Sequence, residues 1–216
     1  MGEKIIQPPF YNSGFYNTGA GGGGGDYKLI GGRSYRTVII GGVEWLAENL
    51  DFKFSGCKLG GSGTPTTPSA WYYDNDEDTY GIDGVRKCGL LYNWYAVKLL
   101  NENKNDIIPG WHVPSDDEWK ELTDAVGGSS TAGTKLKASN VSWASTWGGT
   151  DEFGFDVLPA GDRRGAFYNI GNYADFWTID DTSSSVAINR YFSNGTSINT
   201  SSHDKTDAYS VRLVRD

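Results

Sequence analysis

The stretch GWHVPSDDEW (residues 110–119) predicts the start of a helix between two tryptophans. The Ser115 hydroxyl can accept a hydrogen bond from the backbone N–H three residues later, while Glu118 reaches back to the N–H of Ser115. Pro114 prevents an earlier start, so we expect the helix to begin at Ser115. Trp119, Leu122 and Val126 follow at helical spacing and form its apolar face. The pair Gly127-Gly128 is expected to end the helix.

The composition indicates a domain that binds rather than catalyses. The 216 residues suffice for one packed domain with a tail, and 8 Trp with 13 Tyr exceed what such a core needs. Some of these rings should therefore lie at a surface or interface. A net charge of −8 argues against nucleic acid and anionic membranes as partners. No stretch approaches the roughly 20 apolar residues of a membrane span.

Residues 1–34 differ from the rest and are expected to form a flexible tether, with the globular domain at 35–216. The run Gly21 to Gly25 cannot order itself. A disordered tail is one interpretation. The other is an anchor peptide that docks on a virion or envelope protein through four aromatic residues, Phe10, Tyr11, Phe15 and Tyr16.

Within the domain, helical spacing is also found from Leu91 to Leu99, and strand patterns dominate the last third. A glycine hairpin is expected at Gly41-Gly42. The strands are expected at 153–158, 176–179, 186–192 and 209–214. Asn194-Gly195 predicts a type I′ hairpin that pairs Phe192 with Ser197 and leaves the polar strand SINTSS at a sheet edge.

That exposed edge and the preceding tyrosine-rich loop supply the predicted ligand-binding residues. Tyr offers rigid contact area and Asn adaptable hydrogen bonds, as in recognition surfaces built from loops. Phe167 and Trp177 are assigned to the core instead, with Arg163 and Arg164 paired to local acids. The predicted ligand contacts are Tyr168, Asn172, Tyr173, Asn189, Tyr191, Asn194, Asn199 and His203.

Metal and thiol chemistry receive little support. Asp74, Asp76 and Asp78 alternate as calcium ligands can, but the EF-hand pattern is broken and a solvated acidic loop is the alternative. No other metal site and no cofactor are expected. Cys57 and Cys88 could form a disulfide or stay reduced.

Several blocks together resemble one family, the Fibrobacter succinogenes major paralogous domain, over residues 36–216. The blocks are TVIIGGVEWLAENL, GLLYNWYAV, GWHVPSDDEW, LKAS, GFDVLPAGDRR, DFWT and YSVRLVRD. The resemblance implies an α+β, C-type-lectin-like fold: two helices on a twisted antiparallel sheet, with long loops and termini close together. It is related to formylglycine-generating enzymes, but their late cysteine pair is missing here. It assigns no catalytic residue, and His112 is expected to be structural.

We therefore expect a non-enzymatic adhesion module that binds a host-surface glycan or protein, with a homo-oligomer as one option for its assembly. A phage virion is the favoured location, because the chain has no secretion signal. The alternatives are a secreted or outer-surface bacterial domain and, in another class, an enzyme of the formylglycine-generating type.

Overall fold

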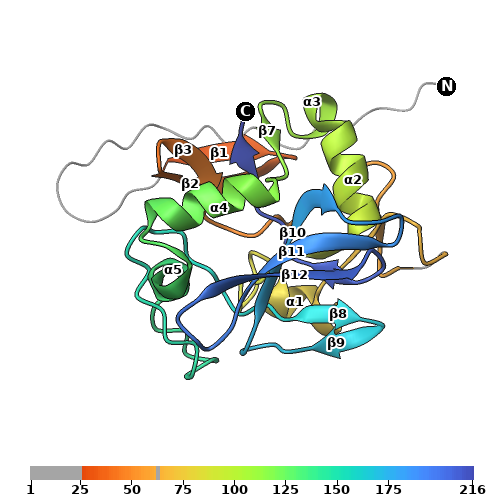
Figure 1. Ribbon diagram of the computed structural model, residues 1–216. Coiled ribbons are helices and arrows are strands. Elements are labelled where there is room, and N and C mark those ends of the chain that lie inside the picture. The colour runs from red at the N-terminus through yellow and green to blue at the C-terminus, as the bar shows by residue number, and fades with distance from the viewer. Residues whose placement is uncertain (1–25, 62–63) are drawn as a thin grey trace, which may run out of the picture.

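The computed structural model describes residues 26–61 and 64–216. The proposed anchor residues Phe10, Tyr11, Phe15 and Tyr16 lie outside the described residues. Within them the protein is α+β, with curled, mostly antiparallel sheets and a few helices (Figure 1).

The first sheet joins the two ends of the described chain. Its order is β1-β2-β3-β14-β7, all antiparallel. The strands are β1 (Tyr27–Ile30), β2 (Arg33–Ile40), β3 (Val43–Leu46), β14 (Val214–Arg215) and β7 (Trp111–His112). Gly41 and Gly42 have φ of 63° and 85°, which confirms the predicted glycine hairpin. Residues 27–34, which the sequence grouped with the tether, are part of this sheet.

Two further sheets form the rest of the strand structure. One has three antiparallel strands in the order β10 (Ala174–Asp181), β11 (Val186–Phe192) and β12 (Ile198–Asp204). The other has the order β4-β5-β6-β13-β8-β9. Its strands are β4 (Lys58–Leu59), β5 (Ser69–Trp71), β6 (Leu91–Asn93), β13 (Ala208–Tyr209), β8 (Asp162–Arg164) and β9 (Ala166–Tyr168).

The helices begin where local capping places them. The Ser115–Glu118 capping box is present and starts α4 (Asp116–Ala125), as predicted. The helix expected near Leu90 begins later, as α2 (Trp94–Glu102), because the Asn93 side chain caps it by accepting from the N–H of Ala96. The other helices are η1 (Tyr73–Asn75), α1 (Glu77–Tyr80), α3 (Lys104–Ile107) and α5 (Ser129–Leu136).

Two strand predictions were wrong. Residues 153–158 make only one isolated bridge, between Val157 and Lys137, because Trp147 and Arg212 take the carbonyl groups of Val157 and Phe155. The stretch 209–214 is divided between β13 and β14, which belong to different sheets. The chain crosses from one sheet to the other at the fully buried Val211 and Arg212.

Aromatic packing holds α4 between the first sheet and the three-stranded sheet (Figure 1). Trp119 lies with its ring centroid 5.2 Å from that of Trp45 in β3 and 5.3 Å from that of Phe176 in β10. Such tilted pairs add to the burial of large apolar area. The opposite face of the three-stranded sheet is therefore left for other contacts.

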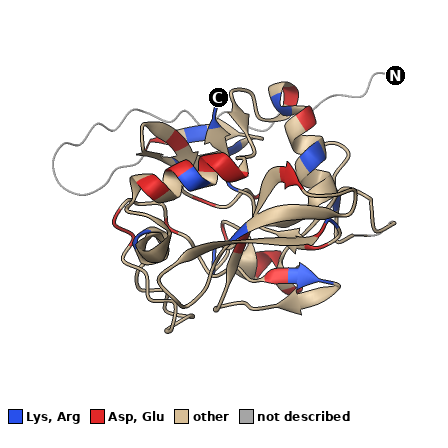
Figure 2. Ribbon diagram, viewed as in Figure 1, with Lys and Arg blue, Asp and Glu red and all other residues tan. Residues whose placement is uncertain are grey.

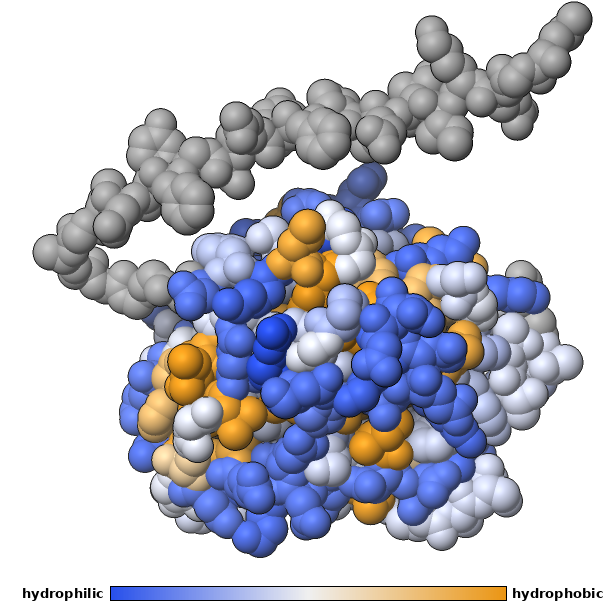
Figure 3. Space-filling view, turned by 90° about the horizontal axis from the view of Figure 1, so that it is seen from above, coloured by the Kyte–Doolittle hydropathy of each residue, from blue (hydrophilic) through white to orange (hydrophobic). Residues whose placement is uncertain are grey.

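The surface above the first sheet carries hydrophobic side chains in separate patches between hydrophilic ones (Figure 3). Tyr27, Leu29 and Ile39, on β1 and β2, are each more than half exposed. None of the described helices is long and apolar enough to cross a membrane. The charged side chains are spread over the molecule, with acids grouped in the first turn of α4 (Figure 2). There, their negative charges interact favourably with the positive end of the helix dipole.

His112 joins the helix start to the C-terminal residue. Its Nε2 lies 2.7 Å from Glu118 Oε1, and its Nδ1 lies 2.7 Å from Asp216 Oδ1. The hydrogen bond to Glu118 and the attraction of both carboxylates raise the pKa of His112, although partial burial opposes this. A structural role, as the sequence indicated, accounts for these contacts.

We expect the His112→Gln substitution to remove a pH-dependent part of the stability, on the order of 1 kcal/mol or less. Because the folded pKa of His112 is raised, its contribution is complete below about 6.5 and is lost as the pH rises through that folded value. The pKa of Asp216 is lowered, mainly by Lys104 and then by His112, so its contribution is lost as the pH falls below about 3.9. Urea unfolding of the parent and the variant should differ most between about pH 4.5 and 6.5. A constant difference from pH 4 to 9 would contradict this prediction.

Candidate functional site

The face of the three-stranded sheet turned away from α4 lines a cavity of about 370 Å³. In the register of this sheet, Asp175 pairs with Tyr191, Tyr191 with Asn199, and Asn189 with Ser201, so these side chains share one face. β8 and the loop before β10 close the other side. The lining residues are Asp162, Arg164, Asn169, Tyr173, Asp175, Tyr191, Ser201, His203 and Tyr209.

Three of the predicted ligand residues meet at this cavity, which we call the tyrosine pocket. Tyr173, Tyr191 and His203 all line it, although they come from a loop and two different strands. The rings of Tyr173 and Tyr191 have centroids 6.3 Å apart and are inclined by 34°. Tyr173 is 39% exposed, so the pair presents an aromatic wall that a ligand can reach.

Other predicted residues lie beside this wall. Asn199 is opposite Tyr191 on the edge strand β12. The side chains of Asn194 and Asn172 are joined by a hydrogen bond of 3.3 Å, and Asn172 directly precedes Tyr173. Tyr168 is 46% exposed. The guanidinium group of Arg164 lies over the ring of Tyr168, 5.6 Å from the ring centroid. These four residues form a polar and aromatic rim next to the pocket.

Asn189 was predicted to be an exposed ligand contact, but its side chain is fully buried. It lies in the central strand β11, with a neighbouring strand on each side, and its amide donates to Asp175 Oδ1 at 2.8 Å. Asn189 therefore supports the pocket from behind rather than forming its surface. Its location in the central strand was missed because sequence alternation alone does not say which strand is central.

The predicted register of the β11–β12 hairpin was wrong by one residue. Phe192 pairs with Ile198 rather than Ser197, and neither Asn194 nor Gly195 has the positive φ of a type I′ turn. The buried ammonium group of Lys137 accounts for the difference, since it donates to the carbonyl groups of Ser193 and Gly195. This shift puts Tyr191 opposite Asn199. The prediction that β12 is an exposed edge strand agrees with the strand order.

Several pocket residues were missed from the sequence. The arginines were expected to pair with local acids that were not specified, and Asp162, Asp175, Ser201 and Tyr209 were not among the predicted ligand contacts. The pairing of Arg164 with Asp162 is present, at 3.2 Å. Figure 2 shows β8 beginning with this acid and continuing as a basic strand. The alternation Asp175-Phe176-Trp177 within β10 was an available signal, because it places an acid on the face opposite a buried Phe.

The pocket has an unusual share of buried polar atoms without partners. Among the described residues, five buried side-chain atoms lack a hydrogen bond, and three of them lie at or directly behind this pocket. They are Asp162 Oδ1, Asn189 Oδ1 and Tyr209 Oη. Unpartnered buried polar groups cost free energy, on the order of 1–3 kcal/mol each. A ligand that supplies hydrogen bonds there would recover part of that cost.

Burial also changes the protonation of the pocket. It raises the pKa of Asp175 to about 8, helped by the nearby charge of Asp162 and opposed by Arg164. Burial raises the pKa of Asp162 as well, and it raises that of Asp207, just before β13, to about 6. Burial and Arg164 lower the pKa of His203. At neutral pH, Asp175 is therefore mostly protonated and His203 neutral.

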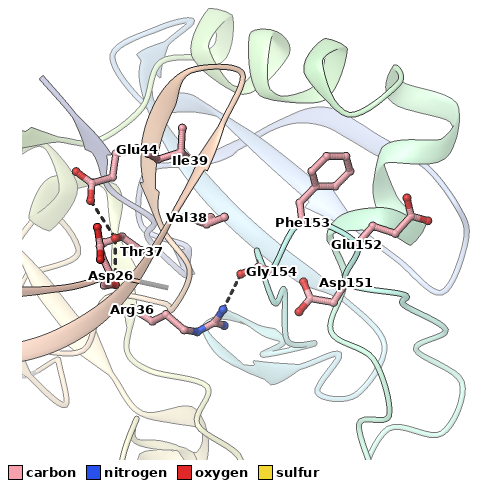
Figure 4. Close-up of a pocket in the computed structure, with 10 residues that line it drawn as sticks. All are labelled: Asp26, Arg36, Thr37, Val38, Ile39, Glu44, Asp151, Glu152, Phe153 and Gly154. Atoms are coloured by element: carbon pink, nitrogen blue, oxygen red, sulfur yellow. Dashed lines mark hydrogen bonds between the residues drawn. The ribbon is translucent and has the colours of Figure 1, made fainter. Parts of the chain in front are cut away.

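A wider groove of about 660 Å³ lies elsewhere, between β2 and the loop 151–154 (Figure 4). Arg36 crosses it and donates to the carbonyl of Gly154 at 2.8 Å, while Thr37 bonds to Glu44 at 2.9 Å. None of the residues that line this groove carries an unpartnered buried side-chain atom. It is larger, but it has none of the unpartnered buried polar atoms found at the tyrosine pocket, so the tyrosine pocket is the stronger candidate.

The acidic residues considered for calcium have other roles. Asp76 caps α1 by accepting from the N–H of Thr79 at 3.0 Å. The Thr79 hydroxyl, and then this backbone bond, lower the pKa of Asp76. Asp74 lies in η1 and Asp78 in α1. In the part of the chain that the structure describes, no group of three or more His, Cys, Asp or Glu is arranged to hold a metal ion.

Comparison with protein families supplies the assignment. The model of the Fibrobacter succinogenes major domain matches residues 38–215. The chain belongs to this family. Searches among curated proteins and among solved structures gave no match. The match includes all residues that line the tyrosine pocket, so the pocket lies within the family domain.

Proposed function

We propose that this domain of the Fibrobacter succinogenes major family is a non-enzymatic recognition module, and that the tyrosine pocket holds a polar group of a surface glycan. One observation carries the proposal: Tyr173, Tyr191 and His203 meet around a cavity that contains unpartnered buried polar atoms. Aromatic walls with a few precisely placed polar groups are typical of small-ligand sites. The fold is proposed to be C-type-lectin-like, and display on a virion or a bacterial outer surface is part of the same proposal.

The two thiols favour recognition over the formylglycine-generating alternative. Cys57 and Cys88 are both buried and are not bonded to each other. Burial raises the pKa of each thiol to about 12. A thiolate nucleophile at neutral pH needs a lowered pKa instead. Neither cysteine lines the tyrosine pocket.

Substitution of Tyr191 by alanine is expected to weaken glycan binding roughly tenfold or more, because tyrosines at the centre of a binding surface are frequent hot spots. The full chain would first be screened on a glycan array, and its best ligand then titrated by calorimetry. Tyr27→Ala is the matched control, since Tyr27 is 65% exposed on β1 and is not part of the pocket. A wild-type chain that binds no glycan would contradict the proposal, as would equal binding by Tyr191→Ala and the parent.

A further inference from the structure

The unpartnered atoms of the tyrosine pocket select for hydrogen-bond donors. Asp162 Oδ1 and the amide oxygen Asn189 Oδ1 are acceptors, while Tyr209 Oη can donate or accept. Asp162 is 3% exposed and lines the pocket. Its other oxygen is already in use, because Asn169 donates to Oδ2 at 3.0 Å and Arg164 lies 3.2 Å from the same atom. Asp162 Oδ1 therefore can accept a hydrogen bond from a ligand.

The charges that face the pocket favour a cation. Asp162 and Arg164 come from β8, Asp175 from β10, His203 from β12, and Asp207 precedes β13. Burial and the charge of Arg164 lower the pKa of His203, so it adds no positive charge at neutral pH. Two carboxyl groups, those of Asp162 and Asp175, thus line the pocket beside a single permanent cation. The acids Asp207 and Asp204 lie near them without being part of the lining. An incoming positive charge would also promote ionisation of Asp175.

The aromatic wall suits the same ligand. Tyrosine faces attract cations through the ring quadrupole, most strongly where water is excluded. Tyr173 and Tyr191 lie side by side at 6.3 Å, and Tyr209 contributes a third ring to the lining. A primary ammonium group combines positive charge with three donors and no acceptor, which matches both the free oxygens and the rings.

The size and the rim of the pocket point to a sugar as the carrier of the amine. A cavity of about 370 Å³ exceeds what one ammonium group on an alkyl stem fills. Ser201 in the lining and the rim residues Asn172, Asn194 and Asn199 offer hydroxyl and amide groups. Sugar hydroxyls can pair with these groups, whereas the methylenes of a lysine side chain cannot.

We propose that the tyrosine pocket binds a sugar that carries an unacetylated amino group, with the ammonium near Asp162 and the sugar ring against Tyr173 and Tyr191. This inference rests on the proposed glycan recognition and specifies its ligand class. It also explains the excess of acids in the pocket, which a neutral glycan would not require.

The test compares two probes that differ only in acetylation: the β-1,4-linked tetrasaccharide of glucosamine and the same tetrasaccharide of N-acetylglucosamine. In calorimetry with the full chain at pH 7, the glucosamine tetrasaccharide should bind at least about tenfold more tightly than the acetylated one. The reason is that only the glucosamine form can make a charge-assisted hydrogen bond. Asp162→Asn should remove that preference. The matched control is Asp83→Asn, because the Asp83 side chain is 90% exposed and is not part of the pocket lining.

The pH dependence gives a second measurement. The pKa of Asp207 is about 6 and that of Asp162 is raised. Affinity for the glucosamine form should therefore rise from about pH 5 to 6, where the sugar amine is still protonated, while affinity for the acetylated form stays flat. If Asp162→Asn fails to fold, Asp207→Asn provides the second variant. It removes a nearby carboxylate that is mostly ionised at neutral pH, so it should reduce the preference for the glucosamine form.

The outcomes separate this inference from the proposed function. Equal binding of both probes, lost in Tyr191→Ala, would overturn the amino-sugar inference and leave glycan recognition intact. No binding of either probe, with a glycan array that is also negative, would overturn both. Tighter binding of Nα-acetyl-lysine methylamide than of the glucosamine form would overturn the choice of a sugar in favour of a protein side chain.

Discussion

Replacement of Arg212 by leucine is expected to lower the free energy of unfolding by about 4 kcal/mol or to prevent folding. Arg212 is 1% exposed and donates to four oxygens, three of them in buried hydrogen bonds and the fourth in a partly buried one. These are Asn49 Oδ1 and the carbonyl oxygens of Leu46, Phe155 and Asp156. Leucine would leave all four acceptors without their donor. Urea unfolding followed by tryptophan fluorescence measures the difference.

The burial of this cation is itself costly, and that cost taken alone would favour a neutral residue. Burial lowers the pKa of Arg212 to about 9, so the group is still charged at neutral pH. Its guanidinium also lies over Phe155, 4.8 Å from the ring centroid. Removing the charge removes the free-energy cost of desolvating the guanidinium. Each acceptor left without a donor, however, costs roughly 1–3 kcal/mol, and the cost of four such acceptors is larger than the desolvation cost that is removed.

Arg215→Leu is the matched control, because Arg215 is exposed at the end of β14. Its loss should change the free energy of unfolding by less than about 1 kcal/mol. Similar values for the two variants would contradict the role given to Arg212, as would an Arg212→Leu variant as stable as the parent.

The elements that were predicted correctly are those whose geometry is set by residues close together in the sequence. The capping box of Ser115 and Glu118 and the Gly41-Gly42 hairpin each involve a few consecutive residues whose geometry is set locally. The span of β11 was also predicted as observed, because its β-rich run has clear turn residues on both sides. The family blocks extended this to the whole domain, and the family match confirmed them.

The predictions that failed depend on distant residues. The register of the β11–β12 hairpin follows from Lys137, which lies 56 residues before Ser193. The burial of Asn189 follows from the order of the strands, which its own sequence does not reveal. Tyr173, Tyr191 and His203 were chosen for their residue type. Asp175 joins them through the pairing of β10 with β11, whereas Asp162 and Tyr209 join them only through the meeting of two sheets.

A second large effect is expected where α5 touches the hairpin that carries the pocket's edge strand. Gly133→Ala should lower the free energy of unfolding by about 2 kcal/mol, since forced overpacking typically costs 1–3 kcal/mol. A Cβ at this position would lie 2.5 Å from the carbonyl oxygen of Ser197 and 2.6 Å from that of Thr196. Both contacts are with backbone atoms, so no side chain can rotate away. Alanine is the better helix former by about 1 kcal/mol, but this gain is smaller than the clash.

Gly195→Ala is the control within the same hairpin. Its φ is not in the left-handed region, and an added Cβ would meet only Ser193 Oγ at 3.5 Å. We expect it to change stability by less than about 0.5 kcal/mol. If Gly133→Ala is as stable as Gly195→Ala, the hairpin is not held against α5 in the way that the structure places it.

The same pair of variants connects packing to recognition. Thr196 and Ser197 lead directly into β12, which carries Asn199, Ser201 and His203. A hairpin pushed away from α5 would move these side chains relative to Tyr191, so Gly133→Ala should also weaken glycan binding at temperatures where it remains folded. Gly195→Ala should bind as the parent does. Weaker binding in the folded Gly133→Ala variant would mean that contacts outside the pocket set its shape, because Gly133 itself does not line it.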